Sequence, residues 1–134
     1  MTARRLALPI IALVLSGGFA SSGQDCALRS SRATAFIGTW VISMTNPAGA
    51  TETVRISDQN GTLAATVQSG RFPPIHVTGL LKDDDTLVLT LTRFENGKPI
   101  RAVISLTLDG DTMHLAQMLE FSETIKHGSG KKQA

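Results

Sequence analysis

The chain has 134 residues, enough for one domain with a single hydrophobic core. Its formal net charge is only +2, and the basic residues are scattered rather than interleaved with aromatic ones. We therefore expect no nucleic-acid partner. The single cysteine, Cys26, excludes an internal disulfide.

The first 22 residues have the pattern of a secretory signal peptide. Arg4 and Arg5 precede an apolar run over residues 6–15, and small residues follow at 16–22. That apolar run is shorter than a membrane span requires. We expect cleavage after residue 20 or 22 and export to the periplasm or the extracellular space, with no membrane association afterwards. Residues 23–35 would then form an N-terminal arm.

From residue 36 onward the apolar residues recur with period two, which is typical of half-buried strands. The expected strands cover residues 40–44, 53–57, 63–67, 75–81, 87–92, 100–108 and 113–121, with a short closing segment at 124–127. Turn sequences such as Asn60-Gly61 and Asn96-Gly97 separate them. We predict an all-β fold over residues 36–127, an antiparallel up-and-down β-barrel of seven to eight strands, with a β-sandwich as the alternative. Residues 128–134 are polar and without periodicity, and we predict a disordered tail there.

The segment Phe36-Ile37-Gly38-Thr39-Trp40 resembles the Gly-x-Trp opening of the calycin superfamily, which includes lipocalins, fatty-acid-binding proteins and avidins. Residues 53–56 and 60–67 also resemble the first hairpin of avidin-like and small bacterial lipocalin-like domains. The resemblance implies an eight-stranded barrel whose closed end is plugged by Trp40. The chain departs from avidins in having one tryptophan, from lipocalins in lacking a C-terminal helix, and from fatty-acid-binding proteins in lacking a helical lid.

An eight-stranded barrel is either filled by its own side chains or holds one small ligand, and the sequence leaves both possibilities open. If it holds a ligand, we expect a small apolar or amphipathic molecule against an inward-facing wall. Two polar residues in phase with that wall, Arg93 and Gln117, would contact the polar head of the ligand. Both have a structural alternative, in which Arg93 lies in solvent at a strand end and Gln117 bonds to backbone. The expected wall residues are Trp40, Leu89, Leu91, Ile104, Leu106, Leu115 and Phe121.

No catalytic, metal or cofactor site is expected. The histidines, His76, His114 and His127, lack the spacing of a metal site. No serine lies in a strand-to-helix elbow, and Cys26 has no base near it in the sequence. We therefore expect a binding protein rather than an enzyme.

A rival hypothesis is a protein–protein interaction module. Some exported protease inhibitors combine a small barrel of this kind with an N-terminal arm that enters the cleft of the target. Residues 21–32 could form such an arm, although the disulfide pair common in those inhibitors is absent.

Overall fold

The computed structural model describes residues 27–46 and 48–134, so the expected signal peptide and Cys26 lie outside the described residues. Two short 3-10 helices, η4 (Ser30–Arg32) and η5 (Thr34–Phe36), precede the strands. The strands are β2 (Gly38–Thr45), β3 (Ala48–Gln59), β4 (Thr62–Ser69), β5 (Ile75–His76), β6 (Gly79–Asp83), β7 (Thr86–Glu95), β8 (Lys98–Asp109), β9 (Thr112–Leu119) and β10 (Ile125–Lys132). In this part of the chain, no helix has the length and apolar character needed to cross a membrane.

All nine strands form one antiparallel sheet in the order β5-β4-β3-β2-β10-β9-β8-β7-β6. The edge strands β5 and β6 are separated in the chain only by Val77 and Thr78. The backbone N–H of Val77 donates to the Ala65 carbonyl of β4 at 3.0 Å, and that of Thr78 donates to the Thr90 carbonyl of β7 at 2.8 Å. Residues 75–83 therefore act as one bent strand on which both sheet edges meet. The predicted all-β, antiparallel architecture is confirmed, and the described residues form nine strands where seven to eight were predicted.

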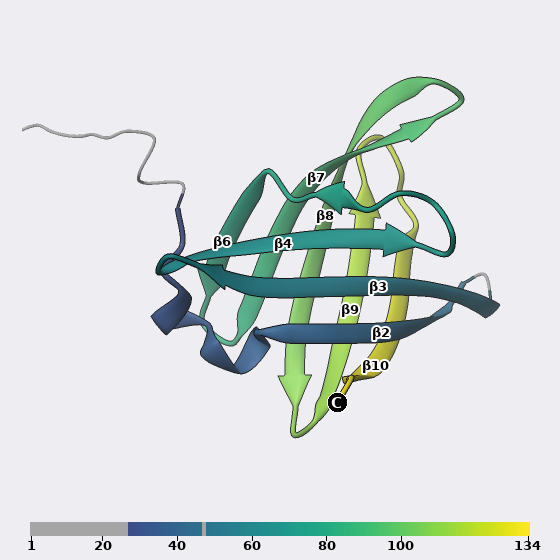
Figure 1. Cartoon of the computed structure of the whole chain (residues 1–134). Coiled ribbons are helices and arrows are strands. Elements are labelled where there is room, and N and C mark those ends of the chain that lie inside the picture. The colour runs from purple at the N-terminus through teal and green to yellow at the C-terminus, as the bar shows by residue number, and fades with distance from the viewer. Residues whose placement is uncertain (1–26, 47) are drawn as a thin grey trace, which may run out of the picture.

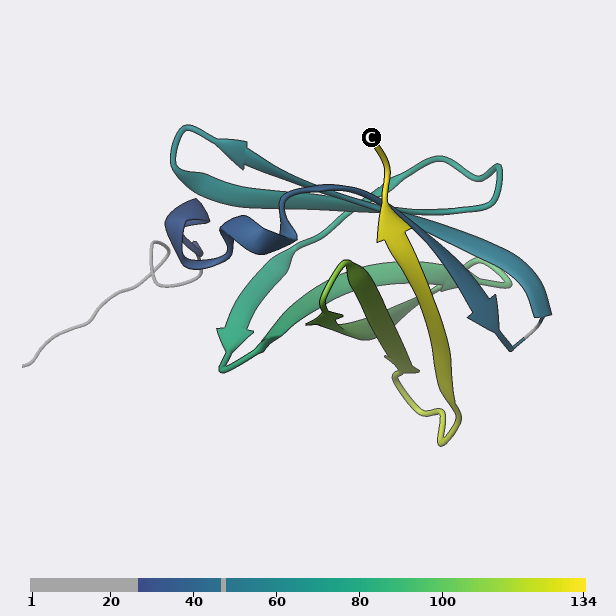
Figure 2. The same ribbon diagram turned by 90° about the horizontal axis from the view of Figure 1, so that it is seen from below.

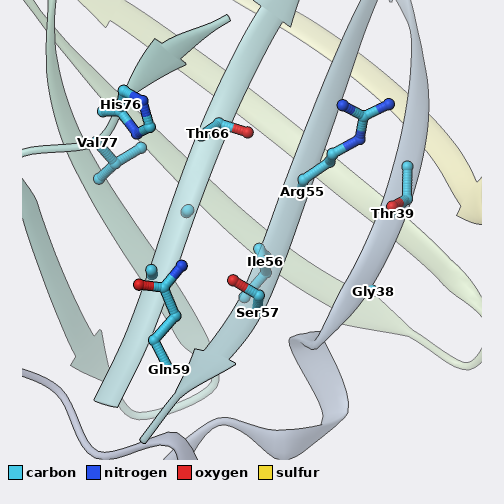
Figure 3. Close-up of a pocket in the computed structure, with 11 residues that line it drawn as sticks. Gly38, Thr39, Arg55, Ile56, Ser57, Gln59, Thr66, His76 and Val77 are labelled. Carbon is cyan, nitrogen blue, oxygen red and sulfur yellow. The ribbon is translucent and has the colours of Figure 1, made fainter.

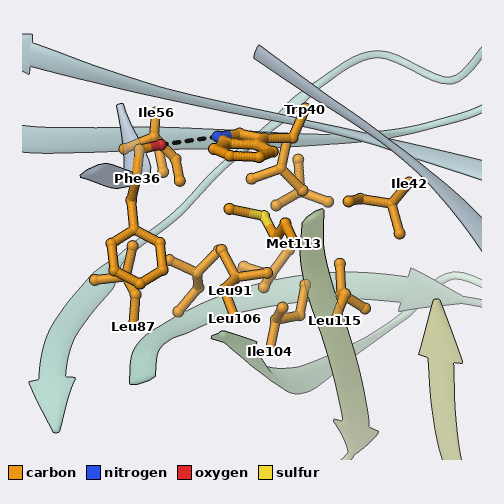
Figure 4. Close-up of a cluster of buried hydrophobic side chains, with 14 of the residues drawn as sticks. Phe36, Trp40, Ile42, Ile56, Leu87, Leu91, Ile104, Leu106, Met113 and Leu115 are labelled. Carbon is orange, nitrogen blue, oxygen red and sulfur yellow. Dashed lines mark hydrogen bonds between the residues drawn. The ribbon is translucent and has the colours of Figure 1, made fainter. Parts of the chain in front are cut away.

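The curling of the sheet produces two layers. Strands β2, β3 and β4 cross in front of β7 to β10 (Figure 1), and the view from below separates the two layers (Figure 2). The inward residues of both layers meet in one apolar core (Figure 4). Ile42, Leu89 and Leu106 are fully buried there, as their period-two alternation predicts.

One end of the curled sheet, which we call the closed end, is covered by η4 and η5. Trp40 is buried at this end, and its Nε1 donates to the Phe36 carbonyl at 2.8 Å. The Ser30 hydroxyl donates to the Asp58 carboxylate, and the Leu63 N–H donates to the Leu28 carbonyl at 2.8 Å. Trp40 thus lies where the resemblance to calycins placed it.

The prediction of a disordered tail at residues 128–134 is wrong, because β10 continues to Lys132. This strand pairs with β9 on one side and with β2 on the other. Two glycines of the predicted tail, Gly128 and Gly130, make that pairing possible. A Cβ on Gly130 would lie 1.8 Å from the Val41 carbonyl oxygen. Glycine removes this clash, so a polar and apparently aperiodic segment forms a strand.

Two lysines fix the end of β10. The Nζ of Lys131 lies 3.2 Å from both carboxylate oxygens of Asp111, in the turn between β8 and β9. This hydrogen bond, together with the positive charge, holds the pKa of the Asp111 carboxyl below its usual value. Lys132 places its Nζ 5.2 Å from the centroid of the Trp40 ring, within the range of a cation–π contact.

Candidate functional site

The end opposite to η4 and η5, which we call the open end, is formed by four connections. These are the β2–β3 turn, the loop of residues 70–74, the β7–β8 turn at 96–97 and the loop of residues 120–124. In an antiparallel meander, alternate connections gather at the same end, so residues far apart in the sequence meet here. Figure 1 shows these connections on the side away from η4 and η5.

A polar cluster crosses the interior at the open end, and we call it the Arg93 cluster. Arg93 of β7 donates from Nε to Gln117 Oε1 of β9 at 2.8 Å, from one terminal nitrogen to Ser69 Oγ of β4 at 2.9 Å, and from the other to Glu52 Oε1 of β3 at 2.6 Å. The side chains of Arg93 and Glu52 are only 13% and 12% exposed. The guanidinium therefore ties together four strands from both layers.

Each member of the Arg93 cluster continues the inward phase of its strand. Glu52 precedes Val54 and Ile56, Ser69 follows Val67, Arg93 follows Leu91, and Gln117 follows Leu115, always at a spacing of two. Arg93 and Gln117 were predicted from the sequence, whereas Glu52 and Ser69 were not. Extending the period-two phase of β3 and β4 one step beyond their apolar residues would have found both.

Above the cluster lies an open hollow of about 450 Å³, which we call the open-end hollow. Its floor includes Glu52, Ser69 and Arg93. Its sides combine apolar and charged side chains, namely Phe72, Pro73, Ile75, Phe94, Glu95 and Lys126. The volume falls within the range of small-molecule sites, and the mixture of apolar walls with a few polar groups is typical of them.

The expected wall of the ligand site is the core of the protein. Trp40, Leu89, Leu91, Ile104, Leu106 and Leu115 are all at most 2% exposed and belong to one packed cluster. None of these six lines the open-end hollow. Of the residues predicted for the ligand site, Arg93 reaches the hollow directly and Gln117 reaches it through Arg93.

Phe121 is not part of the wall, contrary to the sequence prediction. β9 ends at Leu119, and the chain leaves the strand before the alternation reaches residue 121. In the loop that follows, Phe121 has a φ of +67° and is 97% exposed. The period-two count failed here because it assumed that β9 was two residues longer.

A second hollow, of about 440 Å³, lies on the outer face of β2 to β5 (Figure 3). Thr39, Arg55, Thr66 and His76 form one cross-strand row along it, each paired with the next. Arg55 and His76 are exposed to solvent, whereas the arginine at the open end is largely buried and held by three side chains. Burial of a charged group needs specific compensation, which makes the Arg93 cluster the better-defined site.

The three histidines are exposed and lie on different strands or strand ends. Within residues 27–46 and 48–134, no group of three or more His, Cys, Asp or Glu side chains is placed to hold a metal ion.

No family model and no curated protein matches this sequence. Among solved structures, the chain is similar to a protein described as "REP1-NXSQ fatty acid transporter", with a TM-score of 0.51 and 12% sequence identity. The alignment covers 76% of this chain and 98% of the other. At this identity the similarity supports the antiparallel β-barrel fold and nothing finer.

Proposed function

We propose that the protein is an exported, non-enzymatic binding protein for a small amphipathic molecule, which it holds at its open end. The apolar part of the ligand would lie against Phe72, Ile75 and Phe94. Its polar head would accept hydrogen bonds from Arg93 and from Lys126. The site is thus the open-end hollow rather than the barrel interior, which is filled with side chains.

The observation that carries this proposal is the Arg93 cluster at the base of an apolar-sided hollow. Three of the five guanidinium N–H groups have partners among the described residues, which leaves two for a ligand. Because Arg93 lines the hollow, an acceptor on a bound molecule can reach it. The structurally similar protein is described as a fatty acid transporter, and an amphipathic ligand is consistent with that description.

The rival arm hypothesis is less well supported. Residues 28–35, the second part of the expected arm, are held against the barrel by backbone hydrogen bonds to residues 61 and 63 and by the burial of Ser30 and Ala33. An arm that enters the cleft of another protein would have to release these contacts.

The test uses a fluorescent long-chain fatty acid and the corresponding fatty alcohol as probes. Arg93→Met is combined with Glu52→Gln, so that no unpaired charge remains in the site. We expect affinity for the acid to fall roughly tenfold or more, since a charge-assisted hydrogen bond is lost, and affinity for the alcohol to change less. Phe94→Ala should weaken both probes.

Arg55→Met is the matched control, because it removes an arginine from the outer hollow and leaves the open end intact. Equal affinities for the acid in the control and in the double variant would contradict the proposal. So would the absence of binding of either probe to the unmodified protein.

A further inference from the structure

The exposed phenylalanines gather at one end of the molecule. Phe72 in the 70–74 loop is 73% exposed, Phe94 beside the β7–β8 turn is 70% exposed, and Phe121 in the 120–124 loop is 97% exposed. The remaining described phenylalanine, Phe36, is buried at the closed end. Two loops and the end of β7 therefore each present one aromatic side chain to the outside at the open end.

The backbone at Phe121 is strained in a way that the other turns avoid. Among the described residues other than glycine, three more have positive φ, namely Asn60, Asp84 and Asn96, and all are of types that tolerate this conformation. Phe121 has the largest φ of the four, although a bulky side chain disfavours this region. Since its side chain makes almost no contact with the rest of the protein, packing does not explain its presence. A strained and exposed aromatic residue points to a function outside the folded chain.

We propose that the open end docks onto the surface of an electrically neutral lipid bilayer, with Phe72, Phe94 and Phe121 inserted among the head groups. Two of the side chains, Phe72 and Phe121, stand on separate loops, and Phe94 lies near the end of β7, with charged residues between the three. A protein partner would need a contiguous buried centre, whereas head groups solvate the polar residues between inserted apolar tips. Docking of this kind departs from the sequence-based expectation that the mature protein does not associate with a membrane.

The charges of the open end favour a neutral surface over an anionic one. The segments at this end carry five cations, Arg71, Arg93, Lys98, Arg101 and Lys126, and four carboxylates, Glu52, Glu95, Glu120 and Glu123. Arg101 belongs to this end because its backbone N–H donates to the Glu120 carboxylate. The resulting net charge of +1, five cations minus four carboxylates, gives little attraction to anionic lipid. Apolar insertion then supplies the binding energy, and lysine side chains at the rim can extend towards the head groups. Binding should consequently depend little on salt.

The experiment is flotation of the purified protein with phosphatidylcholine vesicles at low and high salt. We expect the unmodified protein to float at both. Phe121→Asn should lower the vesicle-bound fraction roughly fivefold, the effect of removing one inserted aromatic side chain. The same change should raise Tm by roughly 4 °C, because asparagine tolerates the positive φ better than phenylalanine does. If Phe121 served only the structure, its replacement would not lower vesicle binding while it raises Tm.

Leu81→Ser is the matched control. Leu81 lies on β6, away from the open-end loops, and its side chain is 62% exposed. It should float like the unmodified protein. Phe121 does not line the open-end hollow, so Phe121→Asn should leave fatty acid probe affinity unchanged, and loss of ligand binding in Arg93 variants should leave flotation unchanged. Failure of the unmodified protein to float, an equal loss in Leu81→Ser, or an oligomer that Phe121→Asn dissociates would overturn the proposal.

Discussion

At the scale of single residues, Arg93 links the stability of the barrel to its proposed site. Its guanidinium neutralises Glu52 and satisfies Ser69 and Gln117 across the interior, so removing it alone leaves a mostly buried carboxylate without its cation. Loss of one partner of a buried pair costs far more than loss of both, because only the first leaves an uncompensated charge.

Arg93→Met alone should therefore lower the free energy of unfolding by about 3 kcal/mol. Replacement of both partners, Arg93→Met with Glu52→Leu, should recover most of that loss, since methionine and leucine leave no charge in the interior. Urea denaturation of the single and double variants measures both values. If the double variant is as unstable as the single one, the packing of Arg93 rather than its charge holds the open end together.

Among the strands, β10 closes the sheet by pairing with β2, and this pairing requires an unusually close approach of the two backbones. A Cβ at residue 130 would overlap the Val41 carbonyl, and one at residue 128 would lie 2.6 Å from the Met44 sulfur. Both strands would have to separate to accept a side chain. The contact depends on backbone proximity rather than on apolar side chains, which explains why hydropathy does not reveal it.

We expect Gly130→Ala to loosen the β2–β10 pairing and to lower Tm by several degrees, whereas Gly79→Ala should change it little. Gly79 also lies in a strand, but a Cβ there would meet the Thr90 side chain at 3.4 Å, an ordinary contact. Hydrogen exchange locates the effect: amides of residues 40–44 and 128–132 should exchange faster in Gly130→Ala alone. Equal exchange in the two variants would show that the close approach is not required.

The sequence predicts the elements well wherever an apolar face drives them. The alternation of β7, β8 and β9 marks the buried residues because each strand has one face in the core and the other in solvent. It fails for β10, where glycines replace the apolar face, and for Phe121, where the strand ends early. Half of the Arg93 cluster was predicted, and the period-two phase places the other half on the inward face as well. Phase does not show that these residues meet, because the contact of Arg93 with Glu52 spans 41 positions and depends on how the layers cross.

For the molecule as a whole, β10 closes the sheet and thereby shields the apolar core from solvent. β10 is the element that joins β2, at the start of the meander, to β9 near its end. Without β10 the row of β2 backbone groups becomes a free edge, and Trp40 loses the cover of the Lys132 side chain. Among the described residues, the bent strand of residues 75–83 would then be the remaining place where backbone hydrogen bonds join the two layers.

A chain ending at His127 should therefore lose cooperative unfolding and bind the hydrophobic dye ANS, because its core is exposed along β2 and β9. A chain ending at Lys132 is the matched control: it removes only Gln133 and Ala134, and with them one hydrogen bond from the Gln133 N–H to the Thr39 carbonyl at 2.8 Å. This control should unfold cooperatively within a few degrees of the full chain. Calorimetry and dye fluorescence of the two truncations separate a closing strand from a dispensable tail, since a tail would leave both truncated proteins equally stable.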